Sequence, residues 1–193
     1  MKPKIAFFDF AGCEGDQLQI ANLEEEILDL LGQVEVVSFR EVMKEHSDDY
    51  DIAFVEGSCT RQKDEERLKQ IRENAKIVVA IGSCATIGGI NSLKNYQDME
   101  AVKRTVYGKN ADLFETYPAR PIDAVIPVDA YVHGCPIDKK EFLHVVKSLL
   151  LGKKPEIPNY PVCSQKEVLI KYGLSVDDAI GKFKLYFGWE KKK

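Results

Sequence analysis

The sequence predicts a doubly wound α/β fold, in which helices cover both faces of a parallel sheet. Short apolar runs at residues 5–10, 52–55 and 77–81 alternate with segments of helical periodicity, which is typical of parallel sheets. A fourth, extended stretch lies at 124–132. Each of the four segments leads to a cysteine with a glycine one or two residues before it: Cys13, Cys59, Cys84 and Cys135. The carboxyl edge of such a sheet is where ligands bind, so several thiols there favour a soft metal centre.

The first half of the chain alternates predicted strands with predicted helices. Apolar periodicity indicates a helix at 18–31, closed by Gly32. The charged segment 61–74 has a narrow apolar stripe and is expected to be a surface helix. The predicted strands are rich in apolar residues and lie at 4–10, 34–37, 51–55 and 76–81. The strand at 76–81 is almost wholly apolar, as expected for a central strand covered on both faces.

The second half has a weaker pattern. A helix is expected near 97–107, with loops around it, and an extended segment at 124–132. Residues 138–151 form a clear amphipathic helix that Gly152 ends.

Prolines at 155, 158 and 161 then interrupt the chain and predict a domain boundary. We expect one α/β domain at 1–155 and a short extension at 156–193, with a helical stretch at 176–187.

Composition excludes several classes of protein. The 193 residues carry a net charge of −4, which gives no support for nucleic-acid binding. No apolar run approaches the length of a membrane span, and the N-terminus does not resemble a signal peptide. The odd count of five cysteines argues against a disulfide framework. A cytoplasmic protein is therefore expected.

Four motifs occur in a fixed order along the chain: Gly12-Cys13-Glu14-Gly15, Val55-Glu56-Gly57-Ser58, Ile81-Gly82-Ser83-Cys84-Ala85 with Gly88-Gly89-Ile90, and Gly134-Cys135-Pro136. Together they resemble the small subunit of [NiFe] hydrogenases and, more distantly, the cluster-bearing subunit of respiratory complex I. The resemblance covers the 1–155 segment.

This resemblance implies a flavodoxin-like domain that holds one [4Fe–4S] cluster. Three of its ligands would be Cys13, Cys84 and Cys135, with Gly12, Gly57 and Gly82 lining the cofactor. In that family a second cysteine follows the first by three residues, but this chain has Asp16 there.

Two residues compete for the fourth ligand position. Cys59 follows a strand at the same sheet edge and would supply the usual thiolate, so it is favoured over an Asp16 carboxylate. Alternatively, Cys59 is a small buried residue and Asp16 caps the helix that begins near residue 17.

Three further residues have weaker assignments. Glu56, at a strand end, could relay protons or bond across an interface, or it could cap the following helix. His133 could donate a hydrogen bond to the cluster or bond to backbone. Cys163 has no partner cysteine nearby and is expected to be structural or incidental.

The function implied is electron transfer within a cytoplasmic [NiFe] hydrogenase. The cluster would carry electrons between a nickel–iron site in a partner large subunit and a flavin/nicotinamide or ferredoxin-linked redox subunit. The alternatives are a subunit of a complex-I-like oxidoreductase and a flavodoxin-like nucleotide-binding module. Acidic residues in the first loop disfavour a bound phosphate, and the spread of the cysteines disfavours a structural zinc site.

Overall fold

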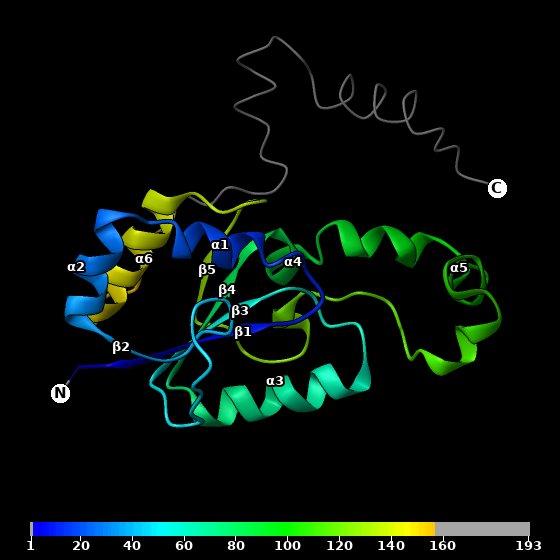
Figure 1. The fold of residues 1–193 in the computed structure, drawn as a ribbon, viewed down its shortest axis with the longest axis horizontal. Coiled ribbons are helices and arrows are strands. Elements are labelled where there is room, and N and C mark those ends of the chain that lie inside the picture. The colour runs from blue at the N-terminus through cyan, green and yellow to red at the C-terminus, as the bar shows by residue number, and fades with distance from the viewer. Residues whose placement is uncertain (1, 157–193) are drawn as a thin grey trace, which may run out of the picture. The chain divides into compact units, whose positions relative to one another are not determined.

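A parallel sheet forms the centre of the computed structural model, which describes residues 2–156 (Figure 1). The five strands found there are ordered β2-β1-β3-β4-β5, the flavodoxin-like order. Their bounds are Lys4–Asp9 for β1, Glu35–Ser38 for β2, Ile52–Glu56 for β3, Ile77–Ile81 for β4 and Ala130–Val132 for β5. All neighbouring strands pair in parallel, so the predicted fold class is confirmed.

Helices connect these strands and cover both faces of the sheet. The α-helices are α1 (Gly15–Ala21), α2 (Glu25–Gln33), α3 (Gln62–Asn74), α4 (Gly82–Ile87), α5 (Met99–Tyr107) and α6 (Lys139–Leu150). Three 3₁₀ helices lie between them: η1 (Ile90–Tyr96), η2 (Gly108–Leu113) and η3 (Ile122–Ala124). Within the described residues, no helix is both long and apolar enough to span a bilayer.

The strand ends are aligned at the carboxyl edge of the sheet. Asp9 of β1 pairs with Glu56 of β3, which pairs with Ile81 of β4, and Ile81 pairs with Val132 of β5. The loops that follow these four strands therefore leave the sheet from one line.

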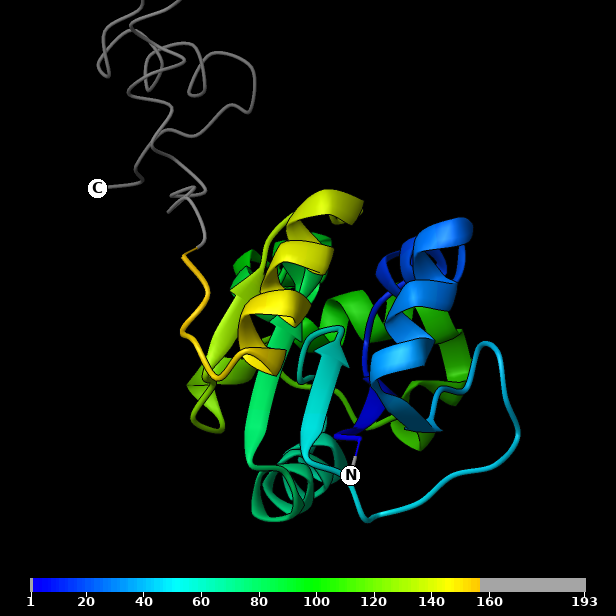
Figure 2. The ribbon, with the colours of Figure 1, turned by 90° about the vertical axis from the view of Figure 1, so that its left-hand side faces the viewer.

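One core lies between the sheet and helices α1, α2 and α6, two of which stand in front of the strands in Figure 2. Alternate residues of a strand face opposite sides, so one set of strand side chains faces these helices. Phe54 of β3 and Phe142 of α6 are fully buried there, with ring centroids 5.4 Å apart. Full burial of each stabilises the fold by about 1.5–3 kcal/mol.

The second core lies on the opposite face, against α3. Leu68 and Ile71 of α3 are the apolar stripe predicted from sequence, and both are buried. They pack with the other set of strand side chains, which includes Ala6, Ala53, Val55, Val78 and Ala80.

The expected single helix at 18–31 is wrong, because it is two helices. The chain leaves α1 at Asn22, and Glu24 adopts a φ of 54° before α2 begins. Leu23 lies in the break between the two helices, yet it is buried, with only 2% of its surface exposed. The apolar spacing therefore continues across the break, which is why the sequence predicted one helix. Gly32 lies within α2 and does not end it.

The extended stretch expected at 124–132 is mostly irregular. The strand is confined to its last three residues, Ala130–Val132. Pro127 lacks the N–H that a strand needs to donate, and η3 occupies the start of this stretch. The helices predicted near 97–107 and 138–151 are confirmed as α5 and α6, and Gly152 has the φ of 67° typical of a helix end.

The predicted helix at 176–187 and Cys163 lie outside the described residues, as does nearly all of the extension at 156–193, whose boundary stays a prediction.

Asp51 ties the starts of three strands together. It immediately precedes β3, and its carboxylate accepts hydrogen bonds from the backbone N–H of Lys4 at 2.8 Å and from the Lys76 ammonium at 2.7 Å. Its backbone carbonyl accepts from the N–H groups of Lys76 and Ile77. The pKa of Asp51 is lowered below 3.8, first by the Lys76 hydrogen bond and then by that of the Lys4 backbone.

We expect Asp51→Asn to reduce the free energy of unfolding by about 1 kcal/mol at pH 7, because the charge-assisted bonds are lost. A lowered pKa stabilises the fold above the ordinary value and ceases to do so as pH falls through it. The gap between wild type and variant should therefore close on acidification below pH 4. Urea unfolding of the full-length chain at several pH values measures this. Asp49→Asn is the control, because the exposed Asp49 carboxylate pairs with the Lys4 ammonium at the surface; an equal loss there would contradict the prediction.

Candidate metal centre

Three of the predicted cysteines line one cavity at the carboxyl edge of the sheet. Cys13 lies between β1 and α1, Cys84 lies in α4, and Cys135 follows β5. The cavity has a volume of about 240 Å³, and Asp16 and Glu56 also line it. Residues from loops far apart in sequence meet here because their strands end level with one another.

The pKa of the Cys84 thiol depends on the other groups of the cavity. Its pKa is raised, chiefly by burial and then by the neighbouring charges of Cys13, Cys135 and Asp16. The backbone N–H of Ile90 acts in the opposite direction by hydrogen bonding to this thiol. Cys84 is partly buried, whereas Cys13 and Cys135 are exposed. The cavity therefore opens to the surface at the latter two thiols.

Asp16 is buried and does not cap the helix in which it lies. Its side chain is 6% exposed and accepts a hydrogen bond from the backbone N–H of Ile137 at 2.8 Å. Burial raises the pKa of Asp16, and the Ile137 bond partly offsets this. Asp16 thus joins α1 to the segment just after Cys135.

The side chain of Glu56, and not that of Asp16, caps the N-terminus of α1. Its buried carboxylate accepts from the backbone N–H groups of Asp16 at 3.3 Å and Gln17 at 2.9 Å. The helix capped is α1, which follows β1, and not the helix that follows Glu56 itself. The pKa of Glu56 is raised to about 7, chiefly by burial and also by the charge of Asp16, while these hydrogen bonds act in the opposite direction.

The three glycines expected to line the cofactor are not among the lining residues of the cavity, but they allow close contacts between the loops around it. Gly82 has a φ of 79°, and a Cβ there would lie 1.7 Å from Oδ2 of Asp16. Gly57 has a φ of 89°, and a Cβ would lie 2.7 Å from the carbonyl carbon of Phe10. A Cβ on Gly12 would approach the Cα of Gly57 to 3.3 Å. Gly12 and Gly57 let two strand-end loops pack backbone against backbone, and Gly82 makes room for the Asp16 carboxylate.

Ser83 also links two cysteine loops, and its role was missed from sequence. Its hydroxyl and its backbone N–H both donate to the carbonyl of Gly134, at 2.8 and 2.6 Å. Ser83 precedes Cys84 and Gly134 precedes Cys135. A polar residue beside Cys84 was the available signal, but nothing in the sequence identified its partner.

Cys59 is not brought to this cavity. It is fully buried in the core against α3, with Sγ 3.5 Å from the Tyr117 hydroxyl and 3.7 Å from Nη2 of Arg120. Its backbone forms an antiparallel bridge with that of Arg120. The sulfur is thus engaged by a separate polar cluster, in which Glu65 pairs with Arg120.

His133 does not line the cavity either. Its ring stacks on Tyr131 with centroids 5.9 Å apart, and burial lowers its pKa. Within the described residues, its buried Nδ1 has no hydrogen-bond partner. Its predicted hydrogen bond to a cluster stays a prediction.

The donor set fits a cluster better than a single ion. Among residues 2–156, no three His, Cys, Asp or Glu side chains stand close enough together to bind one metal ion. A tetrahedral zinc site needs its ligands to converge on one point. An iron–sulfur cluster presents a separate iron to each ligand, so soft thiolates spaced around a cavity suit it.

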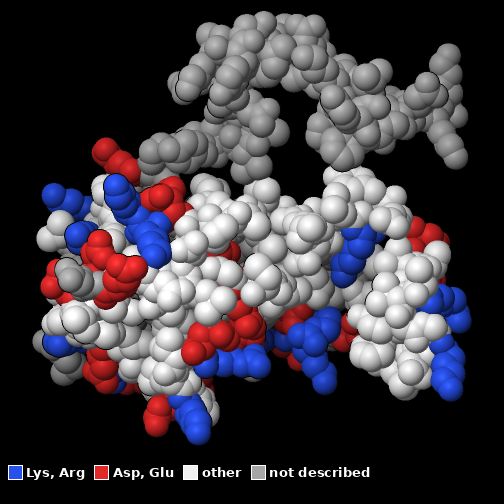
Figure 3. Space-filling model, turned by 45° about the horizontal axis from the view of Figure 1, so that its top comes forward, with Lys and Arg blue, Asp and Glu red and all other residues white. Residues whose placement is uncertain are grey.

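Exposed apolar side chains lie close in sequence to one of the cavity's cysteines. Figure 3 shows one face of the described residues, with a broad area free of Lys, Arg, Asp and Glu across its middle. Exposed large apolar side chains follow Cys84 along the chain: Ile87, Ile90, Leu93 and Tyr96. Exposed apolar side chains grouped beside a site are typical of a protein interface.

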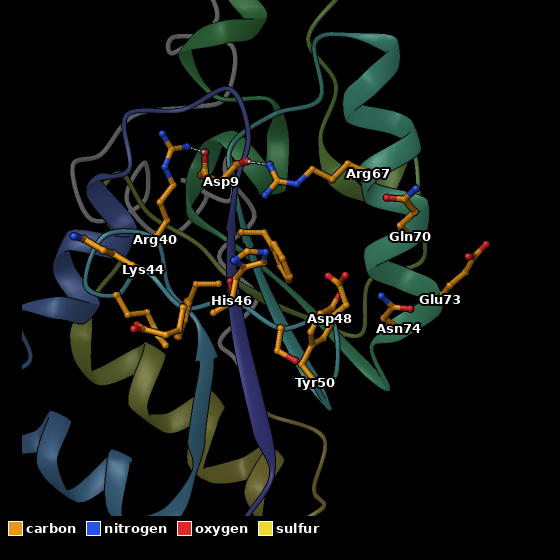
Figure 4. Close-up of a pocket in the computed structure, with 16 residues that line it drawn as sticks. Asp9, Arg40, Lys44, His46, Asp48, Tyr50, Arg67, Gln70, Glu73 and Asn74 are labelled. Carbon is orange, nitrogen blue, oxygen red and sulfur yellow. Dashed lines mark hydrogen bonds and ion pairs between the residues drawn. The ribbon is translucent and has the colours of Figure 1, made fainter.

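A larger cavity, of about 780 Å³, lies between β1, the loop after β2 and α3. Its two arginines are already engaged: Arg40 pairs with the Asp9 carboxylate at 3.0 Å, and Arg67 donates to the Asp9 carbonyl at 3.1 Å (Figure 4). The other charged side chains of the lining are one lysine and three acids: Lys44, Glu45, Asp48 and Glu73. This balance does not favour an anionic phosphate group.

Comparison with known families gives a match over most of the chain. Residues 13–149 match the model of the NADH ubiquinone oxidoreductase 20 kDa subunit. The match begins at Cys13 and ends at Leu149 in α6, so it contains the whole candidate metal centre.

Similar curated proteins are hydrogenase subunits. The chain is 30% identical to sulfhydrogenase 2 subunit delta of Pyrococcus furiosus, over 83% of this chain and 67% of that protein. It is 29% identical to a vhu hydrogenase subunit of Methanococcus voltae, over 85% of this chain but only 62% of that one. The chain thus spans about three fifths of the length of that relative. Subunit delta of the NAD-reducing hydrogenase HoxS of Cupriavidus necator is 26% identical, with 82% and 83% covered.

A solved structure resembles the fold closely. A chain of an NAD⁺-reducing [NiFe]-hydrogenase in its H₂-reduced state superposes with a TM-score of 0.75 at 27% identity, covering 83% of this chain and 97% of that one. A chain of the actinobacterial-type NiFe-hydrogenase from Ralstonia eutropha H16 shares the fold at 18% identity and a TM-score of 0.52, over 83% of this chain and 56% of that one.

We expect Gly82→Ala to displace Asp16, because the added Cβ would lie 1.7 Å from the buried carboxylate. The free energy of unfolding should fall by at least about 2 kcal/mol more than in Gly108→Ala, since a buried hydrogen bond is lost and the packing is strained. Gly108 is the matched control, because its φ is also positive, at 55°, yet nothing lies within 4 Å of its Cβ position. Equal losses in urea unfolding would show that the Gly82–Asp16 contact is unimportant.

Proposed function

Because the chain belongs to the family of the NADH ubiquinone oxidoreductase 20 kDa subunit, and its relatives include hydrogenase subunits, we propose that it is the electron-transfer small subunit of a cytoplasmic [NiFe] hydrogenase. The observation that carries the proposal is the cavity where Cys13, Cys84 and Cys135 meet. When bound there, one [4Fe–4S] cluster would supply single-electron transfer.

Asp16 is proposed as the fourth group that holds the cluster, in place of the Cys59 favoured from sequence. Asp16 lines the cavity and lies close enough to Cys84 to raise the pKa of its thiol. Cys59 does neither, because its sulfur contacts Tyr117 and Arg120 in the opposite core. The carboxylate keeps its Ile137 hydrogen bond through one oxygen, Oδ1, which leaves Oδ2 available.

Side chains of this chain would orient the ligands and limit access of water to the inner side of the cavity. Glu56 fixes the start of α1 after Cys13, and Asp16 fixes the segment after Cys135. Ser83 ties Gly134, just before Cys135, to α4. The buried carboxylates of Asp16 and Glu56 line the inner side of the cavity.

A partner subunit is proposed to cover the outer side. Two of the thiols are exposed, and exposed apolar side chains lie near Cys84. We propose a large subunit with the nickel–iron site as the partner on this face, and a flavin/nicotinamide or ferredoxin-linked subunit as the next electron carrier. The structures and relatives above are subunits of hydrogenases, which supports this assignment.

We expect Cys13→Ala, Cys84→Ala and Cys135→Ala each to lower the iron content of the complex purified anaerobically with its native partners. Hydrogen-dependent reduction of an acceptor should fall with it. Nickel in the wild-type complex would favour a hydrogenase, whereas iron without nickel would favour the complex-I-like alternative. Full iron content in all three variants would overturn the assigned site.

The fourth ligand is tested by a matched pair of variants. Asp16→Asn should alter the paramagnetic resonance signal of the cluster and lower its iron content, because the anionic oxygen donor is lost. Cys59→Ser should leave both unchanged, since its side chain lies in the other core. The reverse ranking would restore the preference for Cys59.

We expect Ile90→Glu to weaken binding of the large subunit by about tenfold or more, because a charge would be placed within an apolar interface. Ile90 is 74% exposed and immediately follows Gly89, which contacts Cys84. Leu28→Glu is the control, because Leu28 is 69% exposed but lies on α2. Co-purification and titration of the two subunits measure the effect; equal weakening by both variants would place the interface elsewhere.

A further inference from the structure

The side chain of Asn91 connects three of the loops at the carboxyl edge. Its Nδ2 lies 2.6 Å from the carbonyl oxygen of Ala11, 3.0 Å from Oγ of Ser58 and 3.9 Å from Sγ of Cys84. Ala11 belongs to the loop of Cys13, Ser58 to the loop after β3, and Cys84 to α4. Asn91 lies in η1, outside all three loops, and none of the sequence motifs includes it.

The hydrogen bonds fix the orientation of the Asn91 amide. The carbonyl of Ala11 can only accept, so it must face Nδ2 rather than Oδ1. The hydroxyl of Ser58 also donates to the Ala11 carbonyl, at 3.2 Å, which leaves its lone pairs free to accept from Asn91. One N–H of Asn91 therefore goes to Ala11, and the second is directed between Ser58 and the Cys84 sulfur.

Two glycines bring Asn91 over Cys84. Gly88 and Gly89 have φ values of 83° and 54°, and η1 starts immediately after them. A Cβ at Gly89 would lie 2.6 Å from Sγ of Cys84, so this turn folds directly onto the thiol. The start of η1, which contains Asn91, is therefore packed beside the Cys84 sulfur.

We propose that Asn91 is a positioning residue that holds the Cys13 and Cys84 loops at a fixed separation and directs an N–H toward the Cys84 sulfur. The inference rests on the proposed function, in which Cys84 is a cluster ligand. A hydrogen bond to a ligating sulfur stabilises the more negative, reduced state and so raises the reduction potential. Asn91 thus both sets the width of the site and favours its reduced form.

Asn95 provides a matched control in the same 3₁₀ helix. Its Nδ2 donates to the carbonyl of Ala119 at 2.8 Å, and its Oδ1 accepts from the Ala119 N–H at 2.7 Å. Asn95 therefore also makes side-chain hydrogen bonds to a neighbouring loop, but none of them reaches a cysteine. Loss of stability alone should affect both variants.

The experiment is a redox titration of the cluster in the complex purified with its native partners, followed by paramagnetic resonance. At the potential where half of the wild-type cluster is reduced, Asn91→Ala should lower the ratio of reduced to oxidised cluster by about three- to tenfold, the effect of about one hydrogen bond. Asn91→Asp should lower it further, because an acceptor replaces the donor. Asn95→Ala should leave the ratio unchanged.

Iron content and thermal unfolding of the same preparations complete the test. Unchanged ratios in both Asn91 variants, with a normal wild-type cluster, would overturn the role of Asn91 while leaving the proposed function intact. An equal shift in Asn95→Ala would reduce the effect to general loosening of η1 and also overturn it. A wild-type complex without iron would instead refute the proposed function.

Discussion

The buried carboxylate of Asp16 is the contact on which the arrangement of the three cysteine loops depends. It lies in the helix that follows Cys13, it accepts the N–H of Ile137 two residues after Cys135, and its Oδ2 occupies the space that a side chain at Gly82 would need, two residues before Cys84. Each loop that carries a cavity thiol is therefore packed against, or bonded to, one side chain. Glu56 in turn holds the backbone of Asp16, so the second carboxylate fixes the first.

This arrangement concentrates negative charge in a partly buried cavity. Burial raises the pKa values of Asp16, Glu56 and Cys84, and the charge of Asp16 adds to the rise at both other groups. Among the described residues, backbone N–H groups and the Asn91 amide are the main donors to them. Neutral donors stabilise these carboxylates and this thiolate only in part. The cavity therefore has more negative charge than its hydrogen bonds compensate, which suits a cationic metal centre.

The sheet could be predicted from sequence, and so could the meeting of Cys13, Cys84 and Cys135 at its carboxyl edge. Both predictions rest on local signals, namely apolar runs and glycine-flanked cysteines. The sequence did not reveal which helix each side chain serves. Glu56 was considered as a cap for the helix after β3, yet it caps α1, about 40 residues earlier. The Asp16–Ile137 bond spans 121 positions and has no periodic pattern. Cys59 follows a strand like the other thiols, but its bridge to Arg120 directs it to the opposite core.

The contact between Gly82 and Asp16 also restricts how this site can vary among related sequences. A side chain at residue 82 and a carboxylate at residue 16 would compete for the same volume, so a side chain can be added at residue 82 only if residue 16 no longer fills that space. A shorter side chain at residue 16 would leave room for a Cβ at residue 82, although the positive φ there still favours glycine. In an alignment of relatives, the residue type at position 16 should therefore predict how strictly glycine is retained at position 82.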